Sequence, residues 1–216
     1  SECWDGFKQK YPKASQARAF ESRYRYALAL GKMKNDAGAV KEFKWLVAQH
    51  PKLDKKDHED DGVRLAAAHA AFELLDPEFA AYSKMKVTLN KKTLLAKATT
   101  AEDLACVDSG DAKCKRQGKF LGILGFGNGD YGIAGLTRMG QVYRGMAEAI
   151  RAAPIPQSLT EDQVEIYRAE LDNVALGPDE KAIQAFENAL DKAYELNIYN
   201  SWTLLAQDNL KQLNPN

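Results

Sequence analysis

The residues from Arg18 to Leu53 carry apolar side chains at the spacing of two short amphipathic helices. A turn-prone segment, Met33 to Ala37, separates the two halves, and Pro51 follows the second half, where a proline ends a helix. The apolar positions expected to face one another across this turn are Tyr26, Ala27, Leu30, Ala39, Phe43 and Leu46. The pattern predicts a helical hairpin. One hairpin of this size cannot bury its own apolar face, so we expect it to stack on further helices.

Helical periodicity continues along almost the whole chain, whereas strand patterns are nearly absent. We therefore predict an all-α fold of about ten helices. Asp76 is expected to cap a new helix that Pro77 opens, and Pro178 is expected to open another over 179–196. Further helices are expected over 63–75, 94–107 and 131–152, with a last one around Trp202, Leu205 and Leu210.

The helix expected over 131–152 has the clearest apolar stripe, and four glycines lie within it. The stripe comprises Leu136, Met139, Tyr143, Met146 and Ile150, and the glycines are Gly132, Gly135, Gly140 and Gly145. Each glycine weakens a helix by about 1 kcal/mol relative to alanine, so four of them indicate close approach by neighbouring backbones. We predict that this helix is central. Thr160 and Gln163 then form a capping box that begins the following helix.

The chain divides into three parts that we expect to form one continuous array. An N-terminal segment with the hairpin covers 1–53, and middle helices with a charged connector and a cysteine loop cover 54–130. The C-terminal helices, 131–216, repeat the second-helix spacing of the hairpin at Ala182, Phe186 and Ala189.

The charge balance argues against a nucleic-acid partner. The 30 basic and 30 acidic residues cancel, so no overall field attracts a polyanion. The balance hides an asymmetry, because 84–119 is mostly basic whereas 161–195 is mostly acidic. No run of about 18 apolar residues occurs, so we expect no transmembrane segment in this chain. The numbering begins at Ser1 rather than at a methionine, which is compatible with a signal peptide or lipid anchor upstream.

The three cysteines are Cys3, Cys106 and Cys114. A polar connection with Gly110 near its middle separates the second from the third and can bring their Cα atoms to disulfide distance. In an exported protein we expect a Cys106–Cys114 disulfide, and free thiols are the alternative. Metal binding is not expected, because no histidine has a spacing that would complete a tetrahedral site with these cysteines.

The segment Gly127-Asn-Gly-Asp-Tyr-Gly132 matches the glycine pattern of dinucleotide-binding loops, and the apolar stretch 120–126 before it could pass for a strand. Such a loop binds pyrophosphate only within a parallel sheet whose second strand supplies an acidic ribose ligand about 20 residues on. Here that position falls in a helix and a proline-containing loop. We therefore prefer an inter-helix turn with Asp130 as N-cap, and nucleotide binding or enzymatic activity at this loop is an alternative function.

Two other sequence patterns are weaker indications of a functional site. Asp57 to Gly62 imitates the first half of a calcium-binding loop, but Ala68 stands where the bidentate glutamate belongs. His69 lies in an alanine-rich helical run, where a packed histidine with satisfied hydrogen bonds is the expected role. No catalytic set stands out, so we predict neither an enzyme nor a cofactor.

The hairpin from Arg18 to Leu53 resembles a tetratricopeptide repeat (TPR), in its small and aromatic positions and its closing proline. Departures occur in the last repeat, with Glu170 at a small-residue position and Tyr194 at the closing proline. The second half is similar to envelope-associated TPR proteins of deltaproteobacteria, some described as components of adventurous gliding motility. The residues that carry this resemblance are Leu94-Leu-Ala-Lys97, 125–132, Gly135-Leu-Thr-Arg138-Met-Gly140, Ala153-Pro-Ile-Pro156, Tyr167, Lys181-Ala182 and Tyr199-Asn-Ser-Trp202.

The resemblance implies a helical-repeat (α-solenoid) scaffold that is exported, periplasmic or associated with the outer membrane. We expect it to bind a protein or peptide of the cell envelope on the concave face of the repeats, without catalysis. The first helix of a repeat lines that face, so Tyr24, Leu28 and Lys32 are the expected partner contacts. A self-assembling architectural protein, held together by the opposite charges of its two parts, is a further alternative.

Overall fold

The computed structural model describes residues 15–106 and 117–214, and within them every regular element is helical. This confirms the all-α prediction for the described chain. The α-helices there are α2 (Gln16–Lys32), α3 (Asp36–Gln49), α4 (Lys55–His58), α5 (Asp61–Lys84), α6 (Lys91–Ala105), α7 (Lys119–Gly122), α8 (Gly129–Arg151), α9 (Glu161–Leu196) and α10 (Ser201–Leu213). Two 3-10 segments, η1 (His50–Lys52) and η2 (Ile123–Phe126), join them.

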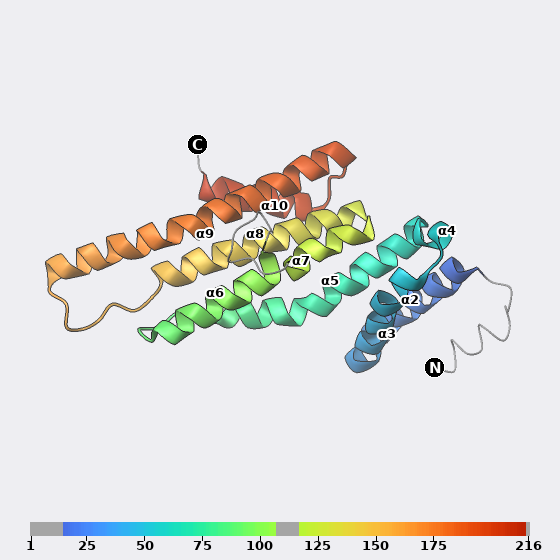
Figure 1. The fold of residues 1–216 in the computed structure, drawn as a ribbon, viewed down its shortest axis with the longest axis horizontal. Coiled ribbons are helices and arrows are strands. Elements are labelled where there is room, and N and C mark those ends of the chain that lie inside the picture. Colours follow the sequence, from blue (N-terminus) through green and yellow to red (C-terminus); the bar gives the residue numbers. More distant parts are fainter. Residues whose placement is uncertain (1–14, 107–116, 215–216) are drawn as a thin grey trace.

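The predicted hairpin is present as α2 and α3 (Figure 1). The side chain of Ser15 caps α2 and that of Asn35 caps α3, each by accepting a hydrogen bond from a backbone N–H of the first turn. The predicted facing positions Ala27, Leu30, Ala39, Phe43 and Leu46 are all buried in one cluster. Alanines from the first half of α5 complete that cluster, so the hairpin buries its apolar face against α5.

Helix α8 lies at the centre of the remaining helices, as predicted. It packs against α5, α6, α7, α9 and α10, and all five residues of its predicted stripe are buried. The helices α8 and α9 run antiparallel along much of their length (Figure 1). Tyr82 ties α5 to α8 because its hydroxyl donates a 2.6 Å hydrogen bond to the carbonyl of Val142.

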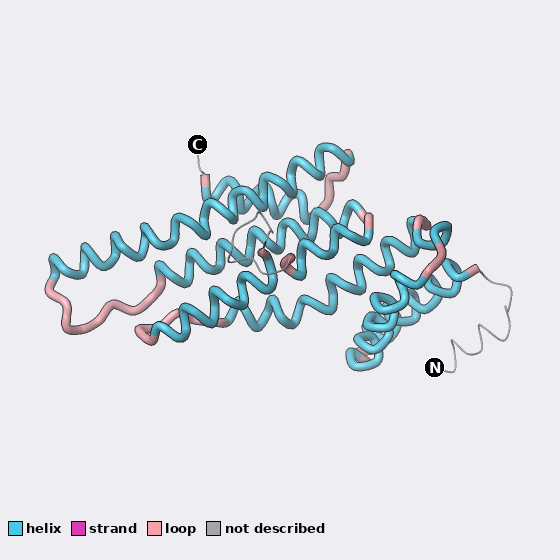
Figure 2. Tube along the Cα trace, viewed as in Figure 1, coloured by secondary structure: helices cyan, strands magenta, loops and turns pink. Residues whose placement is uncertain are grey.

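The prediction that Pro77 and Pro178 open new helices is wrong. Each lies inside one long helix, α5 or α9, and Figure 2 draws both helices without a loop. A proline in a helix interior costs about 3 kcal/mol, because it removes one hydrogen bond and crowds the preceding turn. Both helices bury residues on either side of the proline, for example Ala175 and Ala182 on α9. Packing of this continuous stripe outweighs the local preference.

The segment before α8 does not form the strand that the nucleotide-binding alternative needs. The stretch 120–126 forms α7 and η2, so it is helical rather than a strand. Gly127 adopts the left-handed conformation (φ 71°) that ends η2. The N-cap of α8 is Asn128 rather than Asp130, because the Asn128 side chain accepts a hydrogen bond from the backbone N–H of Tyr131. Asp130 lies in the first turn of the helix instead.

Two main cores result, and α5 contributes to both. The N-terminal core joins α2, α3 and the first half of α5, whereas the larger core joins α5 to α6, α7, α8, α9 and α10. The predicted boundary at 53/54 falls between η1 and α4, and that at 130/131 falls in the first turn of α8. Thr160 and Gln163 form the predicted capping box at the start of α9.

The first turns of α9 extend beyond the end of α8 (Figure 1). Arg151, the last residue of α8, pairs with Asp172 and Asp179 of α9. Residues 161–170 therefore lie past the last turn of α8, and most of them are exposed.

Candidate functional site

The three predicted partner contacts on α2 lie in different environments. Tyr24 is half-buried, and its hydroxyl lies 2.5 Å from Nδ1 of His69 on α5. Burial and the nearby Glu73 carboxylate raise the pKa of Tyr24. Leu28 is half-buried against the N-terminal core, and Lys32 is exposed in the last turn. The hydroxyl of Tyr24 is thus engaged inside the protein, and Lys32 is the most accessible of the three.

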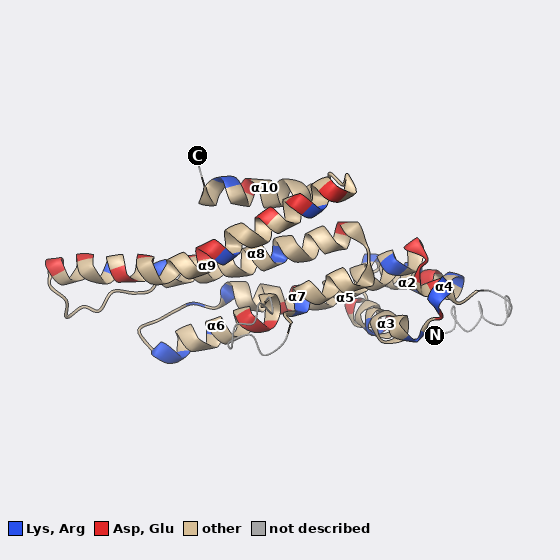
Figure 3. Cartoon of the chain, turned by 45° about the horizontal axis from the view of Figure 1, so that its top comes forward, with Lys and Arg blue, Asp and Glu red and all other residues tan. Residues whose placement is uncertain are grey.

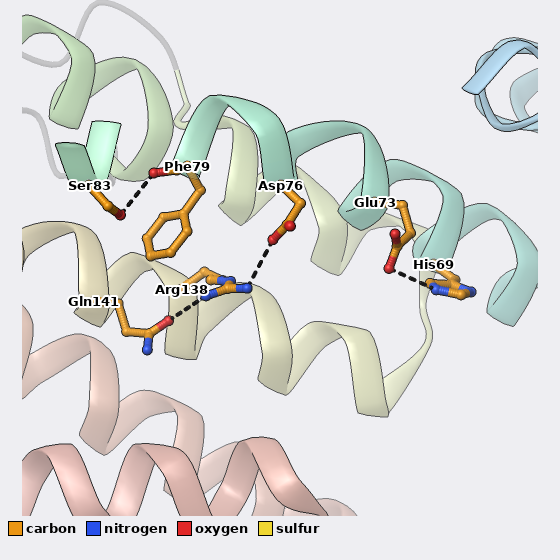
Figure 4. A network of polar contacts seen from close by, with 7 residues as sticks. All are labelled: His69, Glu73, Asp76, Phe79, Ser83, Arg138 and Gln141. Carbon is orange, nitrogen blue, oxygen red and sulfur yellow. Dashed lines mark hydrogen bonds and ion pairs between the residues drawn. The ribbon is translucent and has the colours of Figure 1, made fainter. Parts of the chain in front are cut away.

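His69 is packed and hydrogen-bonded, as expected. Its Nε2 lies 3.1 Å from Oε1 of Glu73, one turn further along α5 (Figure 4), and its ring stacks on Tyr131 with centroids 4.8 Å apart. The hydrogen bond from His69 is the main reason that the pKa of Glu73 is lowered. These contacts join α2, α5 and α8, and they give both ring nitrogens of the histidine a partner.

A second group of polar side chains joins α5 to α8 (Figure 4). The Arg138 guanidinium donates hydrogen bonds to Asp76 and to Gln141, each 3.0 Å long, and lies 4.2 Å from the centroid of the Phe79 ring. Burial lowers the pKa of Arg138, and Asp76 opposes that effect. This arrangement links the two helices, because the planar Arg138 cation lies between a carboxylate and an aromatic ring of α5.

The glycine-rich loop 127–132 has no sheet beside it in the described chain. Gly127 and Asn128 connect η2 to α8, the residues 129–132 form the first turn of α8, and the side chain of Arg64 lies next to Gly127. The geometry that dinucleotide-binding loops use is thus not found in the described residues, and nucleotide binding stays a prediction without a structural observation in its favour.

The acidic run 57–62 has capping roles. Asp57 is buried within α4, and Asp60 caps α5 by accepting hydrogen bonds from the backbone N–H groups of Gly62 and Val63. No group of three or more histidine, cysteine or acidic side chains among the described residues is arranged to hold a metal ion.

Cys106 is buried at the C-cap of α6. Cys114 and Cys3 lie outside the described residues. The expected Cys106–Cys114 pairing therefore stays a prediction.

An apolar groove lies between the last turns of α9 and the start of α10. Asn197 reverses the chain there in the left-handed conformation (φ 53°), and the Asn200 side chain caps α10. The groove has a volume of about 460 Å³. Its lining comprises Leu190, Ala193, Tyr194, Asn197, Ile198, Tyr199, Thr203 and Gln207.

Two tyrosines in this lining are unusually exposed. Tyr194 is 88% exposed and Tyr199 is 74% exposed, and the neighbouring Leu196 and Leu204 are also exposed. Single exposed apolar residues are common, but a group of this size at a groove is a candidate interaction surface. In the sequence, Tyr194 stands out only as a departure from the closing proline. Its exposure follows from where α9 ends relative to α10, which periodicity does not report.

Three acidic residues neighbour the lining residues along α9 and α10, and we call them the rim of this groove. Glu187 and Asp191 are exposed on the same face of α9, one turn before Leu190 and Tyr194 respectively. Asp208, beside Gln207 on α10, is exposed as well. None of the three forms an ion pair within the described part of the chain. We call the groove, its two tyrosines and this rim the α9–α10 surface.

Comparisons with known proteins assign no family to this chain. A scan against protein-family models, a search of curated proteins and a search of solved structures each returned no match to this chain.

Proposed function

We propose that the protein is a non-catalytic interaction module that binds a protein or peptide partner on the α9–α10 surface. The observation that carries this proposal is the pair of exposed tyrosines, Tyr194 and Tyr199, beside an apolar groove. Tyrosine is among the residues that contribute most binding energy at protein interfaces, because its ring buries a large area at a low cost in conformational entropy.

The chemistry of the surface specifies the partner. An apolar groove takes apolar side chains, and the acidic rim attracts basic residues on either side of them. The partner is therefore a segment with apolar anchors flanked by lysine or arginine. The groove is short, which suits a peptide segment or a helix end more than a broad flat face.

The cellular setting of the proposal comes from the resemblance to envelope TPR proteins, which implies a periplasmic or outer-membrane-associated scaffold. No helix in the described ranges is long and apolar enough to cross a membrane. The α2–α3 hairpin supports a relation to helical repeats. The extension of that repeat into a solenoid is part of the proposal.

The test is affinity capture from an envelope fraction followed by titration with the purified partner. The groove bait carries Tyr194→Ala and Tyr199→Ala. A matched control bait carries Leu95→Ala on α6 and Ile166→Ala at the opposite end of α9 from the groove, which also remove exposed apolar side chains, 65% and 64% exposed. A third bait, with Tyr24→Ala and Lys32→Glu, tests the α2 face.

We expect a partner that the wild type and the control bait retain and that binds the groove bait at least about tenfold more weakly. Loss of the partner in the third bait alone would place the binding face on α2. Equal retention by every folded bait would contradict both surfaces.

Self-assembly is a second candidate, because unpaired charges of opposite sign lie at one end of the molecule. Figure 3 shows basic residues at the outer end of α6 and acidic residues along the first turns of α9. Lys91, Lys92, Glu161 and Glu165 form no ion pair within the described residues. Light scattering at low and high salt distinguishes this function, because charge-driven association weakens as salt screens it.

A further inference from the structure

A second cavity, separate from the α9–α10 surface, opens between α5, α6, α8 and α10. Its volume is about 510 Å³, within the range of small-molecule sites. Its lining includes Phe79, Met85, Lys97, Gln141, Arg144 and Glu148. No residue lines both cavities. This inference therefore goes beyond the proposed function, and its test is independent of the test of the α9–α10 surface.

Lys97 places a positive charge in the wall of the cavity. Its side chain is almost fully buried, with the residue 1% exposed, and its ammonium donates to the backbone carbonyls of Tyr82 (3.1 Å) and Met85 (2.9 Å). No carboxylate lies within ion-pair distance of Lys97 in the described part of the chain. Burial lowers the pKa of Lys97, and the more distant Glu148 opposes that effect. The charge therefore lacks a contacting counter-ion.

Arg144 offers hydrogen-bond donors that the protein does not use. Its Nε donates to Glu148 (2.7 Å) and its Nη1 to Asn209 (2.8 Å). A guanidinium carries five N–H donors, so Nη2 keeps both of its donors without a partner among the described residues. Gln141 accepts from Arg138 through its oxygen (Figure 4), and its amide nitrogen has no described partner.

The charge and the apolar wall together define the ligand. Two cations and one carboxylate line the cavity, so its formal charge is +1 and matches one anionic group. Phe79 and Met85 provide an apolar side. Inorganic anions gain nothing from such a wall, whereas the body of an organic acid buries apolar area there.

We propose that this cavity binds a small organic acid, with its carboxylate on Arg144 and Gln141 and its apolar body against Phe79 and Met85. Lys97 acts through its charge rather than by contact, because its ammonium is occupied by the two carbonyls. The bidentate geometry of a guanidinium favours a planar carboxylate.

The test uses calorimetric titration of the full chain at low ionic strength with hexanoate and phenylacetate. Hexanamide and phenylacetamide are the uncharged controls, and inorganic phosphate is the control for a simple anion. We expect both carboxylates to bind and both amides to bind at least about tenfold more weakly, since charge-assisted hydrogen bonds are about twice as strong as neutral ones. Phosphate binding as tight as that of the carboxylates would overturn the assignment to an organic acid.

Two variants test the location. Arg144→Gln removes the donors, and we expect it to weaken carboxylate binding about tenfold or more. Gly145→Leu fills the cavity, because Gly145 lines it and a Cβ there meets only Tyr82, at 3.6 Å. Gly31→Leu, on α2 where nothing lies within 4 Å of the added Cβ, is the matched control and should leave binding unchanged.

The assignment is overturned if neither carboxylate binds at concentrations up to about 10 mM, or if both variants bind as the wild type does. Circular dichroism establishes that each variant is folded. If Gly145→Leu does not fold, Arg144→Gln alone decides the location.

Discussion

The ring of Phe186 on α9 lies directly against the backbone of Gly140 on α8. A Cβ at position 140 would stand 2.5 Å from Cε1 of that ring, closer than carbon atoms approach without a shift of one helix. Phe186 is fully buried, so it has no room to move aside. This glycine therefore sets how closely α8 and α9 can pack.

Replacing Gly140 by alanine should destabilise the protein by about 1–3 kcal/mol, because the added methyl group overpacks a closed interface. The matched change Gly145→Ala, on the same helix, adds a methyl group at an ordinary contact distance of 3.6 Å. That variant should be neutral or more stable by up to about 1 kcal/mol, the helix preference of alanine over glycine. Urea denaturation measures both. Equal stability of the two variants would show that α8 and α9 are not held at this distance.

Pro178→Ala should stabilise the protein by about 1–2 kcal/mol. The change restores a backbone N–H in the interior of α9 and removes the clash of the proline ring, and the greater freedom of the unfolded chain offsets part of that gain. The measurement is the urea midpoint together with amide hydrogen exchange in the middle of α9. A loss of stability would mean that the proline shapes the helix for its contact with α8.

Stability should fall between about pH 6.5 and pH 4 because of His50. This side chain is buried between Phe126 and His58, and its Nε2 has no hydrogen-bond partner in the described chain. Burial, then His58 and Arg64, lower the pKa of His50 to about 4 from 6.5. The unfolded state therefore takes up a proton between these values and the folded state does not, so acid favours unfolding by about 3 kcal/mol at most.

The check on this pH dependence is a series of urea denaturation curves from pH 7.5 to pH 4 on the wild type and on His50→Leu. The variant lacks the titrating group, so its stability should change less across this interval. Parallel pH profiles for the two proteins would rule out His50 as the source.

Arg138→Lys should cost about 1–2 kcal/mol although the charge is kept. Lysine cannot reach Asp76 and Gln141 together, and its ammonium does not lie flat on Phe79 as the guanidinium does. A double-mutant cycle with Gln141→Ala measures the coupling of one of these contacts. Zero coupling energy would show that the hydrogen bond between the two side chains adds nothing.

The helical hairpin, the central position of α8 and the capping box at Thr160 were predictable, because each depends on side chains within one or two turns. The continuity of α5 and α9 through Pro77 and Pro178 was not predictable from the sequence. Local preference ends a helix at a proline, and only the packing of residues such as Ala175 and Ala182 against neighbours explains why the helix continues. The N-cap at Asn128 instead of Asp130 is an error of two residues between equally good capping side chains.

The candidate sites were less accessible to sequence reasoning. In the sequence, nothing distinguishes Tyr194 and Tyr199 from other aromatic residues. They line one groove only because the end of α9 and the start of α10 lie side by side in the structure. Lys97 appears in the sequence as an ordinary helical lysine, and its burial depends on where α5 ends. The cavity beside Lys97 arises from contacts between helices that are far apart in the chain, whereas the α9–α10 surface depends on how the turn after α9 orients the next helix.

The division of the apolar residues into two cores has a consequence for synthesis. The N-terminal core draws on residues from Ala17 to Ala70, so it can close as soon as the first half of α5 has left the ribosome. The larger core reaches from Ala68 to Ala206, and its early members on α5 and α6 meet their partners only when α8 and α10 have been made. A newly made chain therefore exposes part of these apolar faces until its last helices emerge, and during that time the faces are open to association with other chains.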